Sequence, residues 1–107
     1  KHATTIQVKT NLKPKPGGGK GKAAIDWWLP DTSPAELIAF VNLASETVWI
    51  LTFEEVQRYA QQHSSNRYHL YMYTDPAASP RKADRLAYVY EFESLRLENR
   101  VKKVFGK

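Results

Sequence analysis

The chain has 107 residues, of which 42% are hydrophobic and 25% are charged, and it contains no cysteine. This length suits one modest core, so we expect residues 1–107 to form a single domain. The missing cysteines exclude a disulfide scaffold, a cysteine nucleophile and a thiolate metal site, and they fit a cytoplasmic protein. No apolar run approaches the roughly 20 residues of a membrane helix, so we expect no membrane partner.

Positive charge is concentrated at the two ends of the chain, although the net charge is only +5. Residues 1–25 contain six lysines and no acid, whereas residues 26–66 contain six acids and one arginine. Residues 67–107 contain nine basic residues and five acids. A basic tract beside an acidic body suits a polyanion such as DNA, and a merely soluble lysine-rich surface is the alternative explanation.

The first predicted strand covers residues 3–9. Side chains alternate between the two faces of a strand, so Ile6 and Val8 share one face. Gln7 and Lys9 share the other face.

The segment that follows, residues 11–22, is rich in glycine, proline and lysine. We expect a mobile, exposed basic loop there, because such a composition cannot build a core. Its lysines are the candidate nucleic-acid contacts: Lys13, Lys15, Lys20 and Lys22. Residues 24–29 then predict a short strand or bend. Trp27 and Trp28 would point to opposite faces of a strand, so that one of them is free to stack on a base, but core packing of both is the safer prediction.

Two further strands and a helix follow. Residues 37–43 are apolar on both faces, which predicts a central strand, and residues 47–52 predict a strand joined to it by a short hairpin connection. Thr52 and Glu55 have the spacing of a capping box, so a helix should cover residues 53–62. We expect these two strands and the first one to form one sheet, with that helix against it.

Residues 68–74 predict another strand, with Tyr71 and Tyr73 on one face. Residues 91–105 predict a helix that ends at Gly106. Three basic side chains align along one face of this helix, where a solvated surface is the simplest interpretation: Arg96, Arg100 and Lys103. The predicted fold class is α/β, with α+β as the alternative, built on a small mixed sheet flanked by helices.

The most informative motif is I-Q-V-K-T, because Gln7 and Lys9 project together from one face of a strand. An amide oxygen then lies beside an ammonium group. Metal-dependent phosphodiester cleavage uses such a pairing, since oxygen ligands hold Mg²⁺ and a lysine orients water or stabilises developing charge. Any amphipathic surface strand can show the same pattern, so a purely structural role is the alternative.

The motif is followed in order by the basic loop, the tryptophan pair, L-I-A-F-V-N-L, V-W-I-L-T and a helix. This succession resembles the PD-(D/E)XK nuclease superfamily over roughly residues 4–62. It looks most like small bacterial members in which glutamine replaces the acid of the E-x-K motif. The resemblance implies a restriction-endonuclease-like fold, DNA as substrate and Mg²⁺ as cofactor. It also implies Gln7 and the Val8 carbonyl as metal ligands, and Gln7 and Lys9 as the catalytic residues.

The chain departs from the family pattern at one place. In the family, a metal-binding aspartate lies on a strand before the motif, whereas no acid precedes Gln7 here. We therefore expect an N-terminally truncated chain with little or no nuclease activity of its own; an inert descendant that keeps the sheet is the other explanation. The rival hypothesis is a small basic α/β module that binds nucleic acid or protein without catalysis. A homo-oligomer stays open under both.

Overall fold

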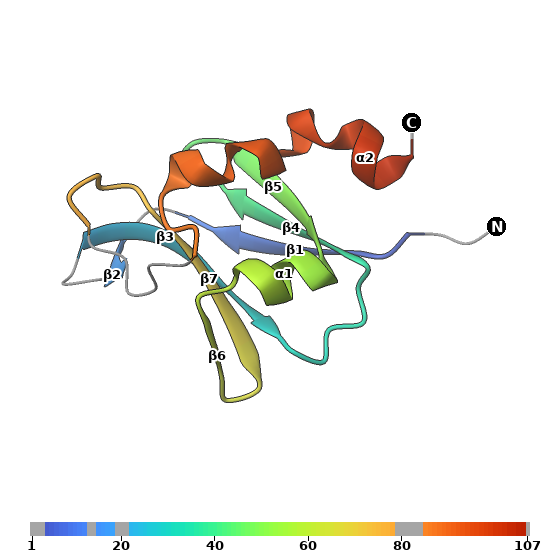
Figure 1. Ribbon diagram of the computed structural model, residues 1–107, viewed down its shortest axis with the longest axis horizontal. Coiled ribbons are helices and arrows are strands. Elements are labelled where there is room, and N and C mark those ends of the chain that lie inside the picture. The colour runs from blue at the N-terminus through green and yellow to red at the C-terminus, as the bar shows by residue number, and fades with distance from the viewer. Residues whose placement is uncertain (1–3, 13–14, 19–21, 79–84, 107) are drawn as a thin grey trace.

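The structure is a computed structural model that describes residues 4–12, 15–18, 22–78 and 85–106 (Figure 1). It shows a mixed α+β fold with two small sheets. Two of the lysines predicted to contact nucleic acid, Lys13 and Lys20, lie outside the described residues.

The three-stranded sheet contains the segments that sequence analysis places in one sheet. They are arranged in the order β1 (Ile6–Asn11), β4 (Leu37–Asn42) and β5 (Thr47–Thr52). The central strand β4 pairs in parallel with β1 and antiparallel with β5. Leu37, Ile38, Ala39 and Phe40 are all buried, because β4 is covered on both faces. The predicted sheet is therefore confirmed.

A second, antiparallel sheet accompanies it. Its four strands follow the order β2 (Lys15–Gly18), β3 (Lys22–Pro30), β7 (Arg67–Tyr73) and β6 (Gln62–Ser64). Strand β2 lies inside the segment that was expected to be a loop, and it pairs with β3 with an irregularity between Pro16 and Gly18. Proline is tolerated here because β2 is an edge strand, which leaves one side of its backbone without a partner strand.

Helix α1 (Phe53–Tyr59) begins where the capping box predicts. The Glu55 N–H donates to Thr52 Oγ1 at 3.1 Å, and the Thr52 N–H donates to Glu55 Oε1 at 2.9 Å. Val56 is fully buried and packs the helix against the core. The local signal for the start of this helix is thus confirmed.

The prediction that this helix extends to residue 62 is wrong. The backbone becomes extended at Ala60, and Gln62 already belongs to β6. Ser65 and Asn66 both adopt positive φ, which makes the tight turn that pairs β6 with β7. The pairing of β6 with β7 therefore replaces the last helical turn.

The C-terminal segment is also more broken than the single helix predicted over residues 91–105. It forms three short helices: η2 (Val89–Leu95), η3 (Leu97–Asn99) and α2 (Val101–Phe105). Arg96 interrupts it, because its extended backbone bridges to Trp49 at the edge of β5. Arg100 is buried rather than solvated, and Gly106 ends α2 with φ 71° as predicted.

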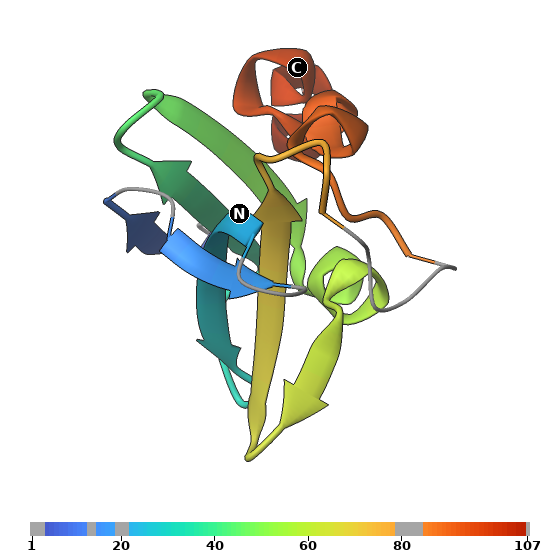
Figure 2. The ribbon, with the colours of Figure 1, turned by 90° about the vertical axis from the view of Figure 1, so that its left-hand side faces the viewer.

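The core lies between the two sheets and is closed by α1 and η2. The Trp27 ring of β3 meets those of Phe40 and Trp49 at centroid distances of 5.2 and 5.7 Å. The C-terminal helices and the β6–β7 hairpin lie at opposite ends of the molecule (Figure 2). Within the described ranges, no helix has the length and apolar character needed to cross a membrane.

Candidate functional site

Neighbouring tryptophans on β3 point to opposite faces of the four-stranded sheet. Trp27 is 3% exposed and belongs to the core, whereas Trp28 is half-buried on the other face. The prediction that the pair splits between two faces is confirmed, and the safer prediction that both pack in the core is wrong. We call the face of this sheet that carries Trp28 the outer face.

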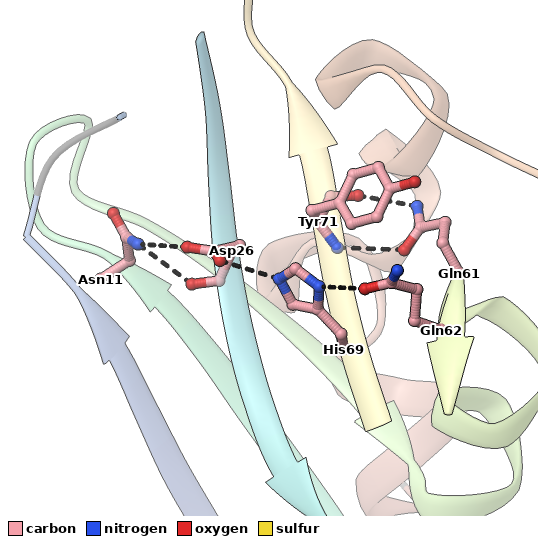
Figure 3. Close-up of polar contacts among 6 residues, drawn as sticks. All are labelled: Asn11, Asp26, Gln61, Gln62, His69 and Tyr71. Atoms are coloured by element: carbon pink, nitrogen blue, oxygen red, sulfur yellow. Dashed lines mark hydrogen bonds and ion pairs between the residues drawn. The ribbon is translucent and has the colours of Figure 1, made fainter. Parts of the chain in front are cut away.

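An aspartate–histidine pair lies at the centre of the outer face (Figure 3). The Nε2 atom of His69 on β7 lies 2.8 Å from Asp26 Oδ2 on β3, and both side chains are largely buried, at 13% and 14% exposed. A carboxylate can only accept a hydrogen bond, so Nε2 carries a proton and donates it to Asp26. This fixes the orientation of the imidazole ring.

Two amides extend the pair across four strands. Asn11 at the end of β1 donates through Nδ2 to the Asp26 backbone carbonyl at 3.0 Å, with Oδ1 of the same residue at 3.4 Å. On the other side, Gln62 of β6 places its Oε1 3.0 Å from His69 Nδ1. Figure 3 shows the four side chains in a row from β1 to β6. The row holds the histidine in one position by contacts on both ring nitrogens.

A cation and two rings stack beside this row. The rings of Trp28 and His69 are parallel, with 3.9 Å between centroids and an interplanar angle of 3°. The guanidinium carbon of Arg67, which is exposed, lies 4.4 Å from the centroid of the Trp28 ring. Arginine over tryptophan is a favourable cation–π arrangement. The result is a positively charged aromatic stack at one end of β7.

Ring contacts continue from this stack along β7 and onto the C-terminal segment. Successive ring centroids lie 5.3 to 5.9 Å apart through His69, Tyr71, Tyr73, Tyr88 and Tyr90. Tyr71 and Tyr73 share one face, as predicted, and are buried with Ala24, Ala78 and Ala87.

The buried Gln61 side chain holds this part of β7 in place. Its Nε2 donates to the Tyr71 carbonyl at 2.8 Å and to the Leu86 carbonyl at 3.0 Å, and its Oε1 accepts from the Tyr71 N–H at 3.0 Å. The amide therefore imitates a paired strand next to β7, as Figure 3 shows. It also ties the segment before Tyr88 to the sheet.

Gln7 and Lys9 lie on one face of β1, as predicted. They are in register with the buried residues Ile38 and Phe40 of β4, so their face is the one turned towards the core. The apolar residues of β1 point outward: Ile6 is 46% and Val8 is 60% exposed.

Two contacts place Lys9 beside the outer-face row. On the same face of β1, Gln7 Oε1 accepts a hydrogen bond from Ser33 Oγ at 2.5 Å, and Asn11 contacts Asp26. Lys9 lies between these two anchors and is half-buried. Among the described residues, no carboxylate pairs with it.

The oxygen atoms near Lys9 do not by themselves suit Mg²⁺. A protein site for this ion uses one or two carboxylates, whereas Gln7 and the Val8 carbonyl offer neutral oxygens, and the Gln7 oxygen already accepts from Ser33. Across the described ranges, no group of three histidine or acidic side chains is placed to hold a metal. These residues therefore do not fit the ion, and magnesium binding stays a prediction of the resemblance.

Two of the predicted lysine contacts belong to the hairpin of β2 and β3. Lys15 pairs opposite Ala24, and Ala24 pairs opposite Tyr73, so the lysine-bearing strand is two strands away from β7. Lys22 begins β3 opposite Gly18. The hairpin thus joins these lysines to the same sheet as Trp28.

Sequence analysis missed Asp26, His69, Arg67 and Asn11 as members of one site. The signal was present in the alternation of residues 24–29 and 68–74, which places Asp26 with Trp28 and His69 with Tyr71. What was lacking was the antiparallel register that joins β3 to β7. Comparison of the chain with family models, curated proteins and solved structures gives no match.

Proposed function

We propose that this protein binds DNA through the outer face of its four-stranded sheet and through the β2–β3 hairpin. The observation that carries this proposal is the stack of Arg67, Trp28 and His69. Aromatic rings provide stacking surfaces for bases, and arginine supplies both a charge for phosphate and a planar group for stacking. The site is rigid, because the Asp26 and Gln62 contacts fix His69.

Charge supports the same function. The net charge is +5, and residues 1–25 hold six lysines and no acid. Two of these lysines, Lys15 and Lys22, lie on strands of the sheet that carries the stack. Neutralising phosphates with lysine or arginine releases counterions, so such an interface gains affinity at low salt.

The test is fluorescence anisotropy with a labelled DNA duplex, repeated over a range of salt concentrations. We expect the double variant Lys15→Ser/Lys22→Ser to bind more weakly and to reduce the salt slope by about 1.8, since each phosphate contact contributes about 0.9. Lys102→Ser/Lys103→Ser, on exposed positions of α2, removes the same charge and is the matched control. An equal loss in both variants would refute a specific role for the hairpin.

Phosphodiester hydrolysis is the second candidate function. Lys9 favours it, because this half-buried lysine lies beside Gln7 and none of the described carboxylates neutralises it. A fixed, unpaired ammonium can stabilise the charge that develops on a phosphate in the transition state. The nearby Asp26 carboxylate is engaged by His69. For this reason we place binding before catalysis.

A plasmid-cleavage assay with Mg²⁺ or Mn²⁺ separates the two functions. We expect weak or no cleavage by this chain, and any cleavage should disappear in Lys9→Ala while duplex binding is kept. Cleavage that persists in Lys9→Ala would remove Lys9 and the I-Q-V-K-T motif from the reaction. Far-ultraviolet circular dichroism of both proteins serves as the folding control.

A further inference from the structure

Two adjoining hollows lie at the far end of the ring row. The first has a volume of about 310 Å³ and is lined by Tyr73, Thr74, Pro76, Tyr88, Val89 and Tyr90. The second, of about 130 Å³, shares Thr74 and Val89 with the first. Its other walls are mostly polar: Asn42, Ser45, Thr47, Trp49 and Arg96. A ligand that fills both would have an aromatic or apolar body and a polar edge.

The first hollow is built for a flat ring. Tyr88 and Tyr90 are stacked at 5.6 Å between centroids with an interplanar angle of 12°. The Tyr88 hydroxyl donates to the Ala78 carbonyl, which fixes that ring, while Tyr90 is 69% exposed. An exposed ring beside a fixed one offers a stacking surface without further cost in rotamer freedom at Tyr88.

The second hollow contains polar groups that lack partners. Asn42 Oδ1 and Trp49 Nε1 are buried, and neither makes a hydrogen bond within the described residues. The Asn42 amide nitrogen donates to Ser45 Oγ at 2.8 Å, so the side chain is held in place. Buried polar atoms almost always have a partner, so an acceptor and a donor left open beside one hollow point to a bound molecule. That molecule should offer both a donor and an acceptor.

We propose that the two hollows take one unpaired nucleobase of single-stranded DNA. The base stacks on Tyr90 and Tyr88, and its hydrogen-bonding edge meets Asn42 and Trp49. This inference rests on the proposed DNA-binding function and adds a preference for single strands. In duplex DNA the base edges are paired and the ring faces are stacked, so neither hollow can be filled.

The hollows are also connected to the basic hairpin. Tyr73, which lines the first hollow, pairs with Ala24, and Ala24 pairs with Lys15. Neighbouring strands lie about 4.8 Å apart, so the backbone of Lys15 is roughly 10 Å from that of Tyr73. Along β7, Arg67 and Tyr73 are six residues apart, or roughly 20 Å. A short single strand is long enough to follow this path.

The test compares two labelled oligonucleotides of equal length by anisotropy: oligo(dT) and an abasic strand that keeps every phosphate. We expect the abasic strand to bind about 5- to 150-fold more weakly, which is the contribution of one stacked base. Tyr90→Ala should remove this difference, and Tyr90→Phe should keep it. Phe105→Ala, at another exposed aromatic residue, should leave it unchanged.

The outcomes separate this inference from the function on which it rests. Equal, salt-dependent binding of both strands by the unaltered protein would overturn the base site and leave phosphate binding standing. A base preference that Tyr90→Ala does not change would also overturn it. Absence of binding to duplex, oligo(dT) and abasic strand alike would refute DNA binding itself. Binding of a proline-rich peptide at Tyr90, without oligo(dT) binding, would reassign the hollow to a protein ligand.

Discussion

The buried ion pair of Arg100 and Glu55 allows a quantitative prediction of stability. Arg100 is 4% exposed; Nη1 and Nη2 donate to the two carboxylate oxygens of Glu55 at 2.7 Å each, and Nη1 also donates to the Ile50 carbonyl at 2.6 Å. Removing one member of a buried pair typically costs about 3–5 kcal/mol. Glu55 keeps the Thr52 N–H as a partner, so we expect Arg100→Met to cost about 3 kcal/mol.

The pH dependence follows from the pKa of Glu55. Burial acts to raise this pKa, but hydrogen bonds from Arg100 and Thr52 and the Arg100 charge outweigh burial and hold it below the ordinary value of 4.5. The pair therefore stabilises the fold fully above pH 4.5, and its contribution is lost as the pH falls through the lowered pKa. In Arg100→Met the opposing hydrogen bonds are gone. The stability difference from the unaltered protein should thus shrink in acid.

Urea unfolding of the two proteins between about pH 7 and pH 3 measures this difference. Lys102→Met, at an exposed position of α2, is the control, and we expect a change within about 0.5 kcal/mol. A cost below about 1 kcal/mol for Arg100→Met would show that the guanidinium is not a structural partner of Glu55. A cost that stays constant with pH would show that Glu55 is not the titrating group.

Three further substitutions test single contacts by urea unfolding. His69→Phe keeps a ring against Trp28 but removes the hydrogen bond to Asp26, so we expect a loss of about 1–3 kcal/mol; an unchanged stability would mean that the bond contributes nothing net. Gln61→Ala leaves buried backbone groups of β7 without their side-chain partner and should cost at least about 2 kcal/mol, whereas a smaller cost would show that water replaces the amide. Thr52→Ala removes the helix cap and should cost about 1 kcal/mol, with Thr52→Ser as the variant that restores it.

The features that could be predicted from sequence are those with local causes. The capping box of Thr52 and Glu55 needs only residues three apart, and Gly106 ends a helix by its own left-handed conformation. The β4–β5 hairpin likewise depends on a short connection between two apolar runs. Each of these signals is complete within a few residues, so no distant partner is needed to interpret it.

The features that escaped prediction depend on contacts between distant residues. The periodicity of residues 91–105 favours one helix, but Arg96 pairs with the edge of β5 and Arg100 reaches Glu55, which lies 45 residues earlier. Both contacts require the chain to leave the helical path. The strand β6 wins over a longer α1 for a similar reason, because β7 offers backbone partners that a frayed last turn does not.

The outer-face site illustrates the same limit and shows how one strand serves both stability and binding. Alternate residues of β3 enter the core, and Ile25, Trp27 and Leu29 are all at most 3% exposed. Their packing fixes the strand, so the residues between them, Asp26 and Trp28, are held rigidly on the outer face. Alternation alone indicates which residues share a face. Only the register with β7, which sets Trp28 opposite His69 and Asp26 opposite Tyr71, brings a carboxylate, an imidazole, an indole and a guanidinium into one site.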